Sequence, residues 1–263
     1  MNISEYIKQL QSFEEYAFSW EEIQQNCDSP ESTLRKELTR LASRNEILNL
    51  RQGFYLIIPP RYQNFMKLPV QLYIDKLFKH LNKKYYVGLY SAASVHGASH
   101  QRIQQDYIIT VPPAVRSIDK GKTRIKFFKT EHWPDFNLIE KKSDAGLYKV
   151  SSPALTMVDL IHYHSKIGGI NRMLANIEEL AEQITKEDVK DLTKWYPYKS
   201  TLQRLGFILD ELEVPSYLPN TLFDRLQKEP FYPVLLTTKK GVKAGSTGNR
   251  WKVDKNIELE SDL

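Results

Sequence analysis

Histidines at two places in the sequence have spacings that bear on metal binding. His96 and His100 are four residues apart, the spacing at which one face of a helix can present two metal ligands. Gly97 between them is expected to end that helix, and no third ligand is evident. His162 and His164 are two residues apart on a predicted helix, so their side chains point to different sides. The sequence therefore predicts neither a metal centre nor a bound cofactor.

Two other features could carry catalysis. Asp106 with Glu140 and Lys142 could be imagined as the metal-binding core of a nuclease, but the spacing and the loop-like setting of Glu140 argue against it. The sequence has no Gly-x-Ser-x-Gly nucleophile elbow. Its single cysteine, Cys27, lies between two predicted helices, where a small packed thiol is the ordinary role. We therefore expect no catalytic residue and no enzymatic activity.

A glycine-rich loop at 241–248 resembles a phosphate-binding loop in composition. It lacks the Gly-Lys-Ser/Thr triplet of that motif, and a strand rather than a helix is predicted to follow it. A flexible hairpin turn is the interpretation that we favour. The alternative is a phosphate contact made by backbone amides together with Lys239, Lys240 and Lys243.

Charge is distributed unevenly along the 263 residues, whose net charge is +5. Residues 1–60 carry 6 basic and 9 acidic side chains, a net −3, although residues 32–58 alone carry 5 and 2, a net +3. Residues 61–130 carry 13 and 3, a net +10. Basic charge concentrated in this way is the footprint expected for a polyanionic partner. The alternative is surface charge that only keeps the protein in solution.

Composition excludes several other classes of protein. No apolar run approaches the length of a membrane span, and the N-terminus lacks the charged-then-apolar plan of a signal peptide. One cysteine excludes an internal disulfide framework and a Cys-based zinc cluster. We expect a cytoplasmic protein with no membrane partner.

The segment from Ser19 to Ile58 is typical of a winged helix-turn-helix. Ser19-Trp20-Glu21-Glu22 fits a capping box that starts a short helix ending near Asn26. A second helix is predicted to start with Ser29 as the N-cap and Pro30 at the first helical position. Its buried stripe is predicted to contain Leu34, Leu38 and Leu41.

The opposite face of the second helix is polar and basic, and a predicted hairpin with the tip Arg51-Gln52-Gly53 follows it. A winged helix places such a helix in the major groove of DNA, although winged helices also serve as protein-interaction modules. The residues that we expect to contact double-stranded DNA are Ser32, Thr33, Arg35, Lys36, Thr39, Arg40, Arg51 and Gln52.

Periodicity predicts an α+β fold, with an N-terminal winged helix-turn-helix at 1–60 and a larger mixed α/β domain at 61–263. The predicted helices are 3–11, 70–81, 85–95, 153–161, 172–183, 186–195, 201–212 and 222–228, and the predicted strands are 106–111, 123–129 and 147–150, with a closing hairpin of 232–238 and 249–257. A possible second basic surface comprises Lys83, Lys84, Arg102, Arg116, Lys122, Arg124, Lys126, Lys129, Lys239, Lys240, Lys243 and Arg250.

Nearly the whole chain, residues 5–258, resembles the AbiEi antitoxins of type IV (AbiE) toxin–antitoxin systems, which act in abortive infection and phage defence. The resemblance rests on the order and spacing of four stretches. They are Arg51–Leu56, Tyr90–Gly97, Val150–Leu160 and Gly248–Asn256.

The resemblance implies two roles. One is transcriptional autorepression, in which the winged helix binds an inverted-repeat operator upstream of a two-gene operon. The other is neutralisation of a nucleotidyltransferase-like toxin without a stable complex. A basic second domain could compete for the RNA target of the toxin or add to DNA binding. Two other classes stay open: a nuclease or nucleotidyltransferase-like enzyme with a DNA-binding head, and a plain transcription factor whose second domain senses a ligand or dimerises.

Overall fold

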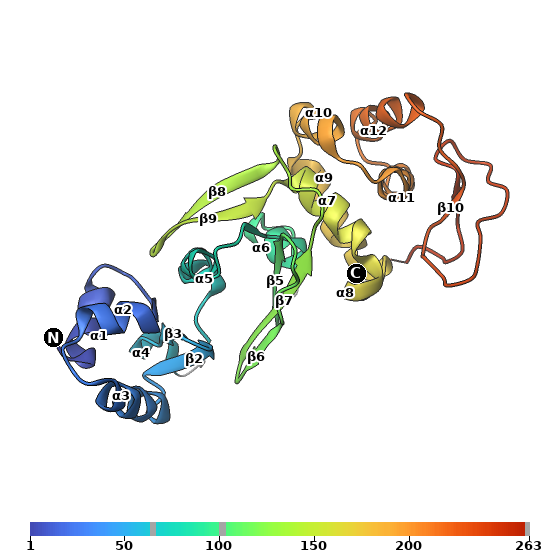
Figure 1. The fold of residues 1–263 in the computed structure, drawn as a ribbon. Coiled ribbons are helices and arrows are strands. Elements are labelled where there is room, and N and C mark those ends of the chain that lie inside the picture. The colour runs from blue at the N-terminus through green and yellow to red at the C-terminus, as the bar shows by residue number, and fades with distance from the viewer. Residues whose placement is uncertain (64–66, 100–103, 261–263) are drawn as a thin grey trace. The chain divides into compact units, whose positions relative to one another are not determined.

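The structure is a computed structural model that describes residues 1–63, 67–99 and 104–260 (Figure 1). It mixes helices and strands, which confirms the predicted α+β class. The chain divides into two compact units. Unit 1 contains residues 1–86, 104–130 and 140–149, and unit 2 contains the described parts of 87–103, 131–139 and 150–263. None of the described helices is both long and apolar enough to cross a bilayer.

Unit 1 begins with helices packed on a small antiparallel sheet whose strand order is β1-β3-β2. The elements are α1 (Ile3–Ser12), β1 (Ala17–Ser19), α2 (Trp20–Asn26), α3 (Glu31–Ser43), β2 (Ile47–Arg51) and β3 (Phe54–Ile57). Their shared core includes Ile3, Phe18, Ile23, Leu34 and Ile57. The helices and the hairpin lie where the sequence predicts them, and β1 is an additional strand.

Of the two N-caps predicted in this segment, that of α2 is present and that of α3 is not. The capping box of α2 is present, because the Glu22 N–H donates to Ser19 Oγ at 3.2 Å and the Ser19 N–H donates to Glu22 Oε2 at 2.6 Å. The predicted Ser29 cap of α3 is wrong. Pro30 is the N-cap, since its carbonyl accepts the N–H groups of Thr33 and Leu34, and no side chain caps this end. Pro30 itself is extended, with ψ of 147°, so the helix begins one residue later than predicted.

A six-stranded mixed sheet follows, with the order β6-β7-β5-β4-β9-β8. It belongs to unit 1 except for the ends of β4, β8 and β9. Its strands are β4 (Tyr85–Val87), β5 (Asp106–Thr110), β6 (Ile118–Lys120), β7 (Thr123–Lys129), β8 (Leu138–Ser143) and β9 (Gly146–Ser151). The predicted strands at 106–111, 123–129 and 147–150 are confirmed. β6 and β8 are additional strands.

The helix predicted over 85–95 is wrong in its first part. Residues 85–87 form β4, and α6 covers only Leu89–Val95. Tyr85, Tyr86 and Val87 are aromatic and β-branched residues that suit a pleated, buried surface, and Val87 pairs with Val150 of β9. The helix predicted over 70–81 is also interrupted. A 3₁₀ turn at Val70–Leu72 precedes α5 (Ile74–His80), and α4 (Pro60–Gln63) lies before both.

Unit 2 is mainly helical. Its helices after α6 are α7 (Pro153–His162), α8 (His164–Ile167), the 3₁₀ turn η2 (Asn171–Met173), α9 (Leu174–Gln183), α10 (Lys186–Trp195), α11 (Lys199–Glu211) and α12 (Tyr217–Gln227). α7 packs against α6, α9, α10 and α11, and residues 154–161 are all buried. A helix that is covered on all sides in this way is the centre of its unit.

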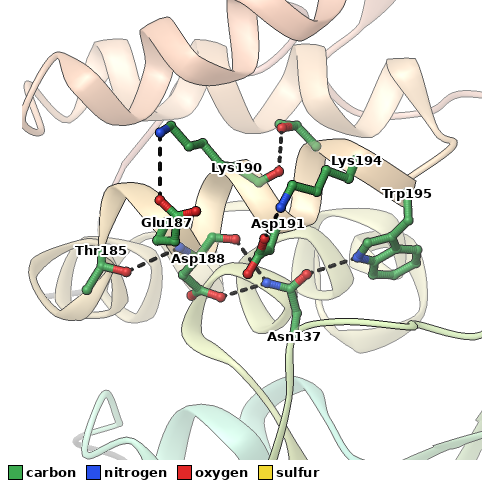
Figure 2. A network of polar contacts seen from close by, with 9 residues as sticks. Asn137, Thr185, Glu187, Asp188, Lys190, Asp191, Lys194 and Trp195 are labelled. Carbon is green, nitrogen blue, oxygen red and sulfur yellow. Dashed lines mark hydrogen bonds and ion pairs between the residues drawn. The ribbon is translucent and has the colours of Figure 1, made fainter.

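Asp188 of α10 holds the start of α7. Its contact with Asn137 is drawn in Figure 2. Ser152 is the N-cap of α7, and its hydroxyl donates to Asp188 Oδ1 at 2.8 Å. The Ala154 N–H donates to Asp188 Oδ2 at 3.0 Å. Asn137 Nδ2 donates to Asp188 Oδ1 at 2.6 Å, while Asn137 Oδ1 accepts from the indole of Trp195 at 2.9 Å. The carboxylate therefore satisfies donors at the positive end of α7 and joins three segments of unit 2.

The predicted closing hairpin is wrong. β10 (Val234–Leu235) and β11 (Val253–Asp254) pair in parallel, and the long connection between them lets the chain return in the same direction. This C-terminal segment is attached to α11. Gln203 Nε2 donates to the carbonyl of Trp251 at 2.8 Å, and Arg204 Nε donates to the carbonyl of Leu235 at 2.8 Å.

Candidate nucleic-acid interface

Helix α3 has one buried face and one polar face. Leu34, Leu38 and Leu41 are buried in the N-terminal core, as their spacing predicts. The side chains predicted to face a nucleic acid are all exposed. They are Ser32, Thr33, Arg35, Lys36, Thr39 and Arg40. The structure therefore brings these six side chains together on one face of one helix.

Arg35 is the most constrained cation on this face. Its Nε and Nη2 donate to Glu31 Oε1 at 2.8 and 2.6 Å, one helical turn away. Its guanidinium also lies 4.5 Å from the centre of the Trp20 ring, at the start of α2. The pair is exposed, so it contributes little to stability, but it fixes the direction of the guanidinium. The sequence-based prediction did not include Trp20 in the site.

Lys36 and Arg40 are less restrained. Arg40 Nη2 lies 3.7 Å from Glu37 Oε1, a long and exposed ion pair. Within the described part of the chain, Lys36 makes no hydrogen bond or ion pair. Thr39 donates its hydroxyl to the backbone carbonyl of Arg35 at 2.9 Å. These cations can therefore bind an anion without first losing a strong partner.

The hairpin tip between β2 and β3 is held against α2. Gly53 has φ of 73°, a conformation that favours glycine, and its carbonyl accepts the Trp20 N–H at 2.8 Å. Gln52 is exposed. Arg51 is half-buried, and its Nη1 has no hydrogen-bond partner in the described structure.

The residues of the predicted second basic surface fall into two groups. Lys83, Lys84, Arg116, Lys122, Arg124, Lys126 and Lys129 belong to unit 1, and Lys239, Lys240, Lys243 and Arg250 belong to unit 2. Arg102 lies outside the described residues. Exposed and buried positions alternate along β7, where Arg124 and Lys126 are exposed while Thr123 and Ile125 are buried. Lys83 instead donates to the carbonyl of Pro113 at 2.9 Å.

Two groups of unit 2 that were predicted to bind an anion, one backbone N–H and one guanidinium, instead bind carboxylates of this chain. The Gly245 N–H of the glycine-rich loop donates to Asp254 Oδ2 at 2.8 Å. Arg250 donates twice to Asp210, at 2.8 and 2.6 Å, and lies over the ring of Trp251. The pKa of Arg250 is raised by this hydrogen bond to Asp210. Arg250 therefore has a structural ion pair, while Lys239, Lys240 and Lys243 are exposed.

Among the described residues, the side chains considered for catalysis and metal binding are not assembled into a site. His96 Nε2 donates to the carbonyl of Ser151 at 2.7 Å, and His100 lies outside the described residues. Asp106 lies in β5 and forms an ion pair with Lys67 at 3.1 Å, and burial raises the pKa of its carboxyl group. Glu140 lies in β8, and β4 and β9 separate these two strands in the sheet. The setting expected for Glu140, a loop, is thus wrong, and the strand order keeps it away from Asp106.

The described residues contain no cluster of three or more His, Cys, Asp or Glu side chains that could hold a metal ion. His162 and His164 have different partners, as their spacing predicts. His162 Nδ1 lies 3.4 Å from the hydroxyl of Thr201, and His164 Nδ1 donates to the carbonyl of Ile161 at 2.7 Å. Cys27 is buried at the end of α2, and burial raises the pKa of its thiol, which fits a packed side chain.

The fold is similar to that of a solved structure. The RV2827C protein from Mycobacterium tuberculosis is 15% identical, with 95% of this chain and 89% of that chain covered at a TM-score of 0.64. An antigenic nucleotidyltransferase-like protein from Paracoccidioides brasiliensis is 11% identical, with 60% of this chain and 85% of that chain covered at a TM-score of 0.32. The sequence matches none of the curated proteins.

The architecture is thus that of an α+β protein with a helical N-terminal segment followed by a larger α/β region. Residues 86–211 match the family of the AbiEi antitoxin C-terminal domain. The chain therefore carries an AbiEi-type antitoxin domain, and this match supports the antitoxin role that the resemblance of the sequence implies.

Proposed function

We propose that this antitoxin represses its own operon by binding double-stranded DNA through residues 1–60, which we interpret as a winged helix-turn-helix. In this proposal, α3 enters the major groove of an inverted-repeat operator and the β2–β3 hairpin is the wing. Arg35, Lys36, Thr39 and Arg40 contact base edges or phosphates, and Ser32 and Thr33 contact the backbone near the start of α3. Arg51 and Gln52 contact phosphate or the minor groove.

The observation that carries this proposal is the polar face of α3. Its helix is anchored by three buried leucines, so the opposite face is rigidly presented. Lys36 and Arg40 lie one turn apart on that face, and both are exposed. A helix of this diameter fits the major groove, where side chains on one face can reach base edges while neighbouring residues touch phosphates.

The test is binding to a duplex that contains the inverted repeat upstream of the gene. Substitution of Arg40 by Ala in combination with Lys36→Ala is expected to abolish the preference for the repeat over an unrelated duplex. Lys8→Ala, on the exposed side of α1, removes one cation away from this face and is the control. All titrations need one salt concentration, because phosphate contacts make affinity depend strongly on salt. Equal binding of both duplexes by the wild-type protein would contradict the proposal.

We further propose that the antitoxin neutralises a nucleotidyltransferase-like toxin encoded beside it, without a stable complex between the two proteins. The support is the AbiEi antitoxin domain at 86–211. Co-expression should restore growth to cells that make the toxin, while affinity capture should recover neither protein with the other. Restored growth together with a stable complex would contradict only the proposal that the two proteins form no stable complex.

A plain transcription factor, with a second domain that senses a ligand or dimerises, is the alternative that this test separates. It would bind the operator but would not rescue growth. A nuclease is disfavoured by the geometry, because Asp106 is paired with Lys67 and two strands lie between its strand and that of Glu140. RNA is a further candidate partner of the basic surfaces, and cross-linking to the RNA target of the toxin would support it.

A further inference from the structure

The hairpin formed by β6 and β7 concentrates basic charge on a small, rigid feature of unit 1. Residues 116–129 contain six Lys or Arg and one Asp, so their net charge is +5, equal to that of the whole chain. Basic and buried positions alternate along β7, with Arg124 and Lys126 on the exposed face. Asp119 is the only acid of the segment, and its 3.5 Å pair with Arg124 is exposed.

The turn of this hairpin is short and well defined. Lys120 pairs with Thr123, which leaves Gly121 and Lys122 as the two loop residues. Gly121 has φ of 58°, and a positive φ at the first loop residue is the requirement of a type II′ turn. Ile118 and Ile125 face each other across the strands and are both buried. The lysines at the tip are therefore held on an ordered hairpin rather than on a loose loop.

The hairpin also lies beside the N-terminal segment. β6 is an edge strand of the six-stranded sheet, β2 is an edge strand of the three-stranded sheet, and the two strands are in contact within unit 1 (Figure 1). β2 directly follows α3 in the chain and forms one side of the β2–β3 hairpin. A duplex that binds α3 and the β2–β3 hairpin would therefore also lie close to the β6–β7 hairpin.

We propose that the β6–β7 hairpin is a second wing that binds phosphates of the same DNA duplex, beyond the part contacted by α3. The proposal rests on the proposed function, because it assigns the hairpin to the same bound duplex. Lys122, Arg124 and Lys126 are the contacts. Their long side chains reach phosphates without reading bases, so the hairpin adds affinity and salt dependence but no sequence preference. The contacts would also lengthen the site protected on DNA.

The experiment is a salt titration of operator binding with Lys122→Gln, Arg124→Gln and Lys126→Gln combined. The dependence of log affinity on log salt concentration should become shallower by about 0.9 for each phosphate contact that is lost. The ratio of affinities for operator and unrelated duplex should stay as in wild type. The control combines Lys8→Gln, Lys142→Gln and Lys149→Gln, three exposed lysines elsewhere in unit 1, and should leave the slope unchanged.

An unchanged slope in the triple variant, with normal operator binding, overturns the second wing and leaves the proposed function intact. The second wing is also overturned if the triple variant loses binding to single-stranded RNA while the salt dependence of its binding to duplex DNA is unchanged. Absence of operator binding by the wild-type protein overturns both proposals. If the thermal unfolding midpoint of the triple variant differs from that of the wild type, Lys126→Gln alone is titrated instead. A decrease of less than about half a unit in the slope of log affinity against log salt concentration then counts against the hairpin.

Discussion

Glu31 holds the guanidinium of Arg35 through two hydrogen bonds to one carboxylate oxygen, while the ring of Trp20 covers its face. Both side chains of the ion pair are more than half exposed. The contact therefore presents a cation in a fixed direction at the start of the helix that we propose reads DNA. It also places a negative charge beside that cation, which would repel an approaching phosphate.

We expect Glu31→Gln to increase affinity for the operator, because the substitution removes this negative charge and keeps the shape of the side chain. Arg35→Ala should weaken operator binding by about 1 to 3 kcal/mol if the arginine contacts a base. Titration of labelled operator at fixed salt measures both effects. Glu178→Gln, an exposed position on α9 in unit 2, is the control for net charge. A Glu31→Gln variant with weakened binding would show that the ion pair orients Arg35 for its contact.

Asp188→Ala should destabilise unit 2 by about 1 to 3 kcal/mol, because buried or half-buried donors of Ser152, Ala154 and Asn137 would lose their acceptor. Urea unfolding followed by circular dichroism measures the loss. Asp191→Ala is the matched control on the same helix, since Asp191 pairs only with Lys194 at the surface in the described contacts. Equal stability of the two variants would contradict a capping role for Asp188.

Gly206→Ala should also be destabilising, by about 1 to 3 kcal/mol. A Cβ at Gly206 would lie 2.2 Å from the ring of Trp251, which is fully buried against α11. The ring cannot move away easily, because its Nε1 donates to Asp210 at 2.6 Å. Gly248→Ala is the control, since a Cβ there meets no atom within 4 Å. Thermal unfolding of the two variants gives the comparison, and a wild-type midpoint for Gly206→Ala would mean that the C-terminal segment repacks.

Sequence patterns predicted best the features that arise from neighbouring residues. The Ser19 capping box and the bounds of Lys186–Trp195 depend on residues within a turn or two of one another. The exposed face of α3 follows from its leucine spacing for the same reason. The Glu31–Arg35 pair is separated by four residues, so the spacing of opposite charges could have indicated it.

The missed features depend on partners far apart in the chain. Whether residues 85–87 form a strand is decided by pairing with β9, some sixty positions later, and not by local periodicity. The same holds for the parallel pairing of β10 with β11. Within the predicted basic surface, Arg250 is bound by Asp210, forty residues earlier. Trp20 was missed as a partner of Arg35 because the contact joins two helices whose packing the sequence does not state.

His164 provides a prediction about pH. Its side chain is 2% exposed, its Nδ1–H donates to the carbonyl of Ile161, and its Nε2 accepts the Thr238 N–H at 3.4 Å. The Thr238 N–H favours the neutral imidazole with Nε2 as acceptor, whereas the Thr238 hydroxyl, 3.5 Å from Nε2, is able to accept from a protonated ring. Burial lowers the pKa of His164 from its ordinary value of 6.5, and nearby Arg204 lowers it further, while the hydrogen bond to Ile161 opposes the shift.

A histidine whose pKa is lower in the folded state takes up its proton more readily in the unfolded state. The stability that depends on neutral His164 is therefore complete above pH 6.5 and is lost as pH falls from 6.5 through the lowered pKa. The free energy of unfolding should decrease between about pH 7 and pH 5, and His164→Gln should reduce that decrease. Burial also lowers the pKa of His162, so part of the dependence should persist in the variant. A wild-type curve for His164→Gln would show that the buried imidazole is not the group that titrates.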